Sequence, residues 1–115
     1  IRPSGVVHSG SMYGDGIYVG SNSSKSINYV DVAGSYWAQG TNKTGFLFLA
    51  DCIFGKQKLA SYSSYYSKDN IKPNHSVWAK AGSGGVINDE MILYNQTGPD
   101  QQHYLRYVIE FETHA

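Results

Sequence analysis

The residues whose types and spacing could support chemistry lie in two short stretches of this 115-residue chain. In the first, Tyr18 lies in an apolar segment bracketed by glycines, and Ser26 and Tyr29 follow it three residues apart. In the second, Glu90 heads an apolar segment, which is an unusual position for a carboxylate. Aromatic rings, hydroxyls and a carboxylate are groups that line binding pockets and stabilise developing charge. These four side chains are therefore the first candidates for a functional site.

A strand and a helix must position the first stretch. The sequence Gly-Ile-Tyr-Val-Gly predicts a short strand at about residues 16–20. A serine N-cap and apolar residues at roughly helical spacing then predict a helix over 23–33 that ends at Gly34. Because residues three apart on a helix share a face, we expect Ser26 and Tyr29 to lie side by side.

The rest of the chain predicts strands separated by turns. The run over residues 45–54 is almost wholly apolar and predicts a strand buried on both faces, the best candidate for the core. Alternation after Glu90 predicts a strand with Glu90, Ile92 and Tyr94 on one face. Further strands are predicted at 75–80 and 103–111, with a loop over 61–74 and a turn over 95–100.

The composition favours one β-rich, soluble domain. Hydrophobic residues make up 41% and charged residues 16%, with 13 Gly and 10 Tyr. The formal charge is zero and the chain has no Lys/Arg run, so nothing favours direct nucleic-acid binding by this segment. No apolar run approaches a membrane span, and the lone Cys52 predicts neither a disulfide nor a metal site. Because the chain begins at Ile1 rather than Met, we expect a processed product or a piece of a longer chain.

The string GDGIYVGSNSSKSINY, from Gly14 to Tyr29, resembles the hallmark of poly(ADP-ribose) polymerases. In that family a Gly-x-Gly-Ile-Tyr strand is followed by Ser-Lys-Ser-x-Asn-Tyr at the start of a helix. Further matches follow in the family's order, at residues 75–77, Glu90-x-Ile-x-Tyr94, Gln102 and 105–107. The resemblance implies an α+β, β-rich ADP-ribosyltransferase fold with mixed and antiparallel sheets and one short helix after the Gly-Ile-Tyr strand. Residues 1–115 would form the C-terminal portion of a single catalytic domain.

The resemblance also implies a reaction. Family members transfer ADP-ribose from NAD to a protein or poly(ADP-ribose) acceptor and release nicotinamide. Glu90 would be the carboxylate that stabilises the oxocarbenium-like ribose, much as carboxylates do in glycoside hydrolysis. Tyr18 would be the middle member of the family's His-Tyr-Glu triad. The implied partners are NAD, used as a substrate, and the acceptor, without a metal ion, and the implied location is intracellular, nuclear or cytoplasmic.

The same resemblance implies an NAD-binding pocket. Nicotinamide is a flat aromatic amide, so a pocket for it needs aromatic walls and amide partners. By position in the motif, Tyr29 would stack on the ring, the hydroxyl of Ser26 would hold the carboxamide, and Tyr18 would close the pocket. Lys25 and Met12 match positions near the acceptor side.

The chain departs from the family pattern at several positions. The family's first triad residue, a His before Gly on an upstream strand, has no match, because His8, His75 and His114 are misplaced for that role. We therefore expect the N-terminal half of the domain to lie outside this chain and the fragment alone to be nearly inactive. In addition, residues 19–21 replace the usual Phe-Ala-Asp, Ser11 replaces an aromatic, and the turn at 96–99 is longer than usual.

Two other classes of function are consistent with the sequence. The first is an inactive relative that binds NAD or ADP-ribose as a recognition module, against which the presence of Glu90 argues. The second is a secreted β-rich glycan-binding domain, suggested by the richness in Tyr, Gly and Asn. Its glycosylation-like motifs lie at Asn22, Asn42, Asn74 and Asn95. That reading predicts occupied glycosylation sites, which an intact-mass measurement detects.

Overall fold

A computed structural model describes residues 12–35, 40–82, 89–95 and 97–113. The chain divides into two compact units: unit 1 is Ile1–Ser21 with Cys52–His103, and unit 2 is Asn22–Asp51 with Tyr104–Ala115. The described residues form six strands and two short helical turns, so the protein is β-rich, as expected. None of the helices in these ranges is long and apolar enough to cross a membrane.

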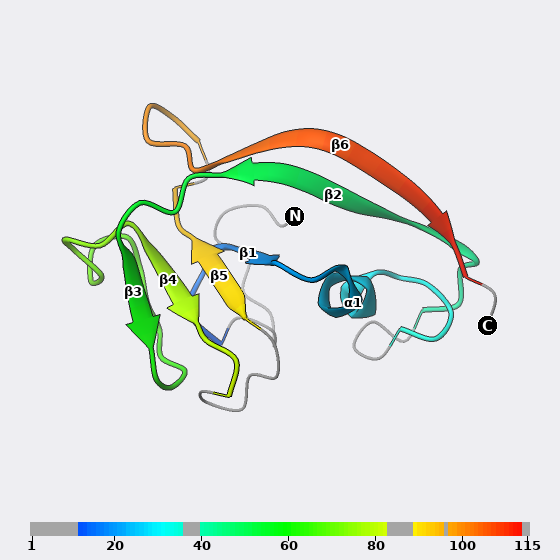
Figure 1. Ribbon diagram of the computed structural model, residues 1–115, viewed down its shortest axis with the longest axis horizontal. Coiled ribbons are helices and arrows are strands. Elements are labelled where there is room, and N and C mark those ends of the chain that lie inside the picture. Colours follow the sequence, from blue (N-terminus) through cyan, green and yellow to red (C-terminus); the bar gives the residue numbers. More distant parts are fainter. Residues whose placement is uncertain (1–11, 36–39, 83–88, 96, 114–115) are drawn as a thin grey trace. The chain divides into compact units, whose positions relative to one another are not determined.

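Unit 1 is built on a four-stranded mixed sheet with the strand order β1-β5-β4-β3 (Figure 1). The strands are β1 (Ile17–Gly20), β3 (Gln57–Ala60), β4 (Ser76–Ala79) and β5 (Glu90–Leu93). β5 pairs antiparallel with β1 and β4, whereas β3 and β4 are parallel. Three of these strands confirm predicted segments. β3 was not predicted, because its Gln-Lys-Leu-Ala sequence has no β-branched or aromatic residue and its pairing with β4 decides its conformation.

One face of this sheet carries the core of unit 1. Ile92 of β5 lies between Tyr18 of β1 and Val77 of β4 in the register, and both Ile92 and Val77 are fully buried. The core cluster consists of Tyr13, Ala60, Ile71, Val77, Ala79, Ile92 and Tyr94. The predicted alternation of Ile92 and Tyr94 is confirmed, since both belong to this cluster.

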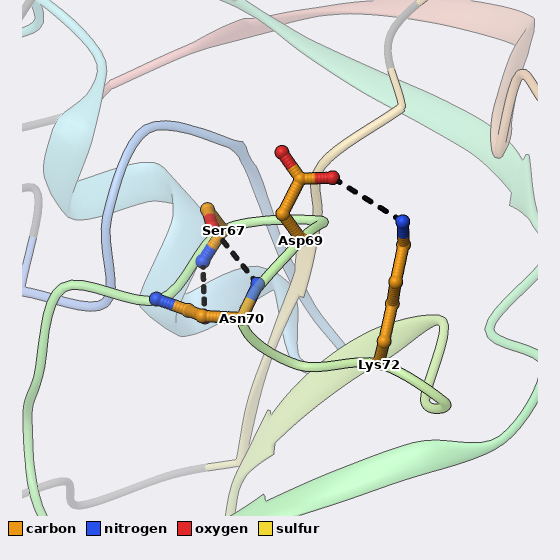
Figure 2. Close-up of polar contacts among 4 residues, drawn as sticks. All are labelled: Ser67, Asp69, Asn70 and Lys72. Carbon is orange, nitrogen blue, oxygen red and sulfur yellow. Dashed lines mark hydrogen bonds and ion pairs between the residues drawn. The ribbon is translucent and has the colours of Figure 1, made fainter.

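The loop over residues 61–74 contains no strand or helix, as predicted, but its backbone is held by specific bonds. The Ser67 N–H donates to Asn70 Oδ1 at 2.8 Å, and the Asn70 N–H donates back to Ser67 Oγ at 3.2 Å (Figure 2). An exposed ion pair joins Lys72 to Asp69 at 3.5 Å in the same turn (Figure 2). Ile71, only 1% exposed, anchors the turn in the core. The loop therefore presents a fixed backbone to the rest of unit 1.

Gln102 is a buried polar side chain that joins three segments of unit 1. Its amide nitrogen donates to the carbonyls of His75 at 2.7 Å and Ile53 at 3.2 Å, and its amide oxygen accepts from the Asn95 N–H at 3.0 Å. Only 4% of the residue is exposed. Because buried polar groups without partners are costly, these bonds make Gln102 a tie between the end of β5, the segment at Ile53 and the start of β4.

We expect Gln102→Leu to destabilise the protein by about 3 kcal/mol, since three backbone groups would each lose a bond to this buried amide worth about 1 kcal/mol. Urea unfolding monitored by circular dichroism measures this change. Gln101→Leu is the matched control, because its half-buried amide donates to the carbonyl of His103 at the edge of the same turn. An equal loss in the two variants would contradict the role given to Gln102.

Unit 2 contains a ribbon of two strands, β2 (Thr44–Cys52) and β6 (His103–Glu112), whose end residues Cys52 and His103 belong to unit 1. The strands run antiparallel, as Figure 1 shows, because the Thr113 N–H donates to the Lys43 carbonyl and the Ile53 N–H donates to the Gln102 carbonyl at the opposite end. β6 confirms the strand predicted at 103–111.

The apolar strand predicted at 45–54 exists, but its predicted burial on both faces is wrong. Phe46, Phe48 and Leu49 of β2 are each more than half exposed, and so are Leu105 and Tyr107 of β6. The physical reason is that a ribbon of only two strands has no further layer of described residues to cover these side chains. The core of the described structure lies instead in unit 1.

The helix predicted over 23–33 is much shorter in the structure. One turn of α-helix, α1 (Ser23–Ser26), continues as a 3-10 turn, η1 (Ile27–Tyr29), and Val30 is already extended. The N-cap is Asn22, whose side-chain oxygen accepts from the N–H and the hydroxyl of Ser24.

Packing explains why the helix ends early. Val32 is 2% exposed and lies against Gly45, where an added β-carbon would be 2.6 Å from Val32 Cγ1. The segment after η1 bends at residues 30–32, and the packing of Val30 and Val32 against Gly45 overrides the weak helical spacing of these valines.

Candidate functional site

Tyr18 and Glu90 lie on the same face of two adjacent strands of unit 1. In the antiparallel register Tyr18 is opposite Ile92 and Gly20 is opposite Glu90. Side chains two residues apart on a strand share a face, so Glu90 is the diagonal neighbour of Tyr18. Diagonal neighbours are about 7–8 Å apart, within reach of an aromatic side chain. Two residues that are 72 positions apart in sequence are thus brought together by the pairing of β1 with β5.

Two glycines allow the backbone before Tyr18 to reach this position. Gly14 has φ +89°, a conformation that favours glycine, and an added β-carbon would lie 2.0 Å from the carbonyl oxygen of Tyr66. At Gly16 an added β-carbon would meet the side chain of Ile92 at 2.6 Å and the carbonyl oxygen of Leu93 at 2.9 Å. The two glycines of the Gly-x-Gly motif therefore allow the backbone to lie close to Tyr66 at Gly14 and close to β5 at Gly16.

The hydroxyl of Tyr18 is bonded to the backbone of its own unit. It accepts from the Tyr13 N–H at 2.9 Å and donates to the Gly14 carbonyl at 2.7 Å. A phenol has one hydrogen to donate, and that hydrogen goes to Gly14. The ring of Tyr18 thus lies beside Glu90 on the sheet, while its hydroxyl holds the segment that precedes β1.

The electrostatics of unit 1 reflect the charge of Glu90. Burial raises the pKa of the Tyr18 hydroxyl well above its usual range, the hydrogen bond from the Tyr13 backbone opposes this shift, and the charges of Glu90 and Asp15 add to it. Burial also raises the pKa of Tyr13, with Glu90 as the next cause. Both phenols are therefore neutral over the physiological pH range, mainly because of burial, with the half-buried Glu90 as a smaller cause.

Ser26 and Tyr29 lie in unit 2, in the helical run formed by α1 and η1. Ser26 is the last residue of α1 and is half-buried, whereas Tyr29 ends η1 and is 52% exposed. Their spacing of three residues in a helical run places both side chains on the same side, as predicted.

The remaining candidates differ in what the structure describes. Met12 is 48% exposed and immediately precedes the buried Tyr13. Lys25 lies within α1, but its side chain is outside the described structure, as are His8 and His114. His75 has a structural part, because its Nδ1 accepts from the Lys56 N–H at 2.9 Å. Among the described residues, no group of three or more His, Cys, Asp or Glu could hold a metal ion.

Sequence reasoning missed three tyrosines beside the site. Tyr13 is fully buried and stacks on Tyr66, with ring centroids 6.3 Å apart, and the hydroxyl of Tyr94 donates to the Tyr13 carbonyl. The alternation Glu90, Ile92, Tyr94 was a signal for Tyr94, since it placed that ring on the face of the carboxylate. No comparable signal existed for Tyr13 and Tyr66, which lie in segments without periodicity.

Comparisons with known protein sequences show which family the chain resembles. The family model of the poly(ADP-ribose) polymerase catalytic domain matches residues 1–109. The chain is also 32% identical over 120 aligned positions to the poly [ADP-ribose] polymerase-like protein 100L of Invertebrate iridescent virus 6. That alignment covers 95% of this chain and 58% of the viral protein, so the chain spans somewhat more than half the length of this relative. The chain therefore belongs to the family of poly(ADP-ribose) polymerase catalytic domains.

Proposed function

We propose that this chain is the C-terminal part of the catalytic domain of an NAD-dependent ADP-ribosyltransferase. In this proposal Glu90 is the catalytic carboxylate, and Tyr18, Ser26 and Tyr29 are the residues that bind NAD. The observation that carries the proposal is the pairing of β1 with β5, which puts Tyr18 and Glu90 on one face of the sheet. The family assignment supports the reaction class, and on the family pattern Met12 and Lys25 lie toward the acceptor.

The reaction breaks the bond between the ribose C1′ and the nicotinamide nitrogen. The bonding electron pair leaves with the nitrogen, which loses its positive charge, and the ribose gains oxocarbenium character. The acceptor then bonds to C1′ and releases a proton. A fixed carboxylate beside the sugar stabilises the positive charge as it develops. Glu90 supplies that carboxylate.

The neutral tyrosines would shape this site rather than exchange protons in it. The Tyr18 hydroxyl donates to the Gly14 carbonyl, so we assign its ring, and not its hydroxyl, to contact with the nicotinamide. The hydroxyl of Ser26 would bond the carboxamide, and the exposed ring of Tyr29 would stack on the nicotinamide ring.

We further propose that the complete site needs a segment of the domain outside this chain. The chain covers 58% of the viral relative, and the apolar side chains of the ribbon formed by β2 and β6 are more than half exposed at several positions. Exposed apolar surface of this kind is typical of an interface that another segment covers. That segment would supply the family's first triad residue, for which this chain has no match.

The test compares the complete protein with the 115-residue chain in a nicotinamide-release assay and an NAD-binding titration. We expect release by the complete protein and at least about 100-fold less by the chain alone, since loss of positioning groups commonly costs that much. Equal release by the chain alone would refute the need for another segment. Tight NAD binding without release by the complete protein would instead support a recognition module.

A further inference from the structure

Two tyrosine hydroxyls hold three consecutive peptide groups of the segment before β1. The Tyr18 hydroxyl bonds both the Tyr13 N–H and the Gly14 carbonyl, and the Tyr94 hydroxyl donates to the Tyr13 carbonyl. Tyr18 belongs to β1, and Tyr94 directly follows β5, which pairs with β1. Three backbone polar groups of the segment before β1 are thus fixed by side chains of the two strands that carry Tyr18 and Glu90.

The surroundings leave this segment little freedom. Tyr94 is 9% exposed and the Tyr13 ring is fully buried against Tyr66. Gly14 lies so close to the Tyr66 carbonyl that no β-carbon fits. Burial also raises the pKa of Tyr94 well above its usual range, so its hydroxyl keeps its hydrogen and remains a donor.

The clamped segment also lies within the electric field of Glu90. Burial raises the pKa of both Tyr13 and Tyr18, and the charge of Glu90 is a smaller cause of both shifts. The Tyr13 hydroxyl is buried and has no hydrogen-bond partner within the described part of the chain. A shift of the Tyr13 backbone would therefore move the dipole of this buried hydroxyl relative to the carboxylate of Glu90.

We propose that Tyr94 is a positioning residue for the reaction assigned above, acting through the Tyr13–Gly14 peptide to hold Tyr18 and the surroundings of Glu90 in place. The proposal rests on the proposed function. It assigns to Tyr94 a larger effect on the chemical step than on NAD binding, because two of the three groups assigned to NAD, Ser26 and Tyr29, lie on α1 and η1 and not in this clamp.

The test is Tyr94→Phe in the complete protein. This change keeps the ring that packs in the core and removes only the hydroxyl. We expect kcat for nicotinamide release to fall on the order of tenfold, since small misplacements of catalytic groups are costly, while KM for NAD changes less than about twofold. Ile71→Val is the control for lost stability, because Ile71 belongs to the same core cluster but makes no part of the clamp.

A second measurement does not depend on activity. The Tyr13 N–H is bonded to the Tyr18 hydroxyl, so its hydrogen exchange by NMR should accelerate in Tyr94→Phe and Tyr18→Phe but not in Ile71→Val. Faster exchange together with the selective fall in kcat supports the proposal. Unchanged exchange, or a kcat equal to that of Ile71→Val, overturns it. If Glu90→Gln also retains full turnover, the proposed function fails, and that outcome is separate from failure of the clamp.

Discussion

Glu90→Gln in the complete protein is expected to lower nicotinamide release by about 10²–10³-fold, equivalent to roughly 3–4 kcal/mol of transition-state stabilisation. The substitution keeps the shape of the side chain and one hydrogen-bonding oxygen but removes the negative charge. NAD binding should survive better than the rate, because the positive charge on the ribose develops only as the bond to nicotinamide breaks. A release assay and a binding titration on both proteins separate the two effects.

The matched control is Glu110→Gln, which removes the same charge from an exposed position on β6. It should leave turnover within about twofold of the parent protein. A loss of less than about threefold in Glu90→Gln would mean that Glu90 is a surface charge, and the mechanism would fail. If binding and turnover fell in equal proportion, Glu90 would hold the ribose in both the ground state and the transition state.

Gly14→Ala is expected to destabilise the protein by about 3 kcal/mol or more, through backbone strain at φ +89° and overlap with the Tyr66 carbonyl. For a chain of this size that corresponds to a fall of roughly 10 °C or more in the midpoint of thermal unfolding. In the complete protein the same change should abolish nicotinamide release, since the Gly14 carbonyl accepts from the Tyr18 hydroxyl.

Gly82→Ala is the control that separates the cost of backbone strain from the cost of overlap with a neighbouring residue. Gly82 has the same φ of +89°, but an added β-carbon would meet nothing within 4 Å. We expect a cost of only about 1 kcal/mol, the strain of a left-handed alanine. Thermal unfolding by circular dichroism measures both variants. Similar losses in the two would show that close packing on Tyr66 does not require a glycine at position 14.

Local patterns identified most of the strands. Glycine-bracketed or alternating apolar segments predicted β1, β4, β5 and β6 close to their observed bounds, because turn residues and period-2 alternation are properties of short stretches of sequence. β3 was not predicted, because its four residues carry no local β signal and form a strand only by pairing with β4.

The predictions that failed concern burial and length. The apolar character of β2 suggested a core strand, but an apolar strand is buried only where other layers cover it, and the ribbon has no such layer among the described residues. The helix after β1 ended early because Val32 packs against Gly45. Neither outcome depends on the residues of the segment alone.

For the candidate site, too, some features follow from the sequence and others only from the tertiary structure. The sequence by itself determined the family of the chain and identified Tyr18 and Glu90 as candidates, because a motif with fixed spacing is a local property that survives without coordinates. Only the tertiary structure decided that the two share one face, that the Tyr18 hydroxyl is bonded to the backbone of residues 13 and 14, and that the Tyr94 hydroxyl bonds the carbonyl between those two groups. The physical reason is that strand register and buried hydrogen bonds join residues up to 81 positions apart, and no local pattern encodes such pairings.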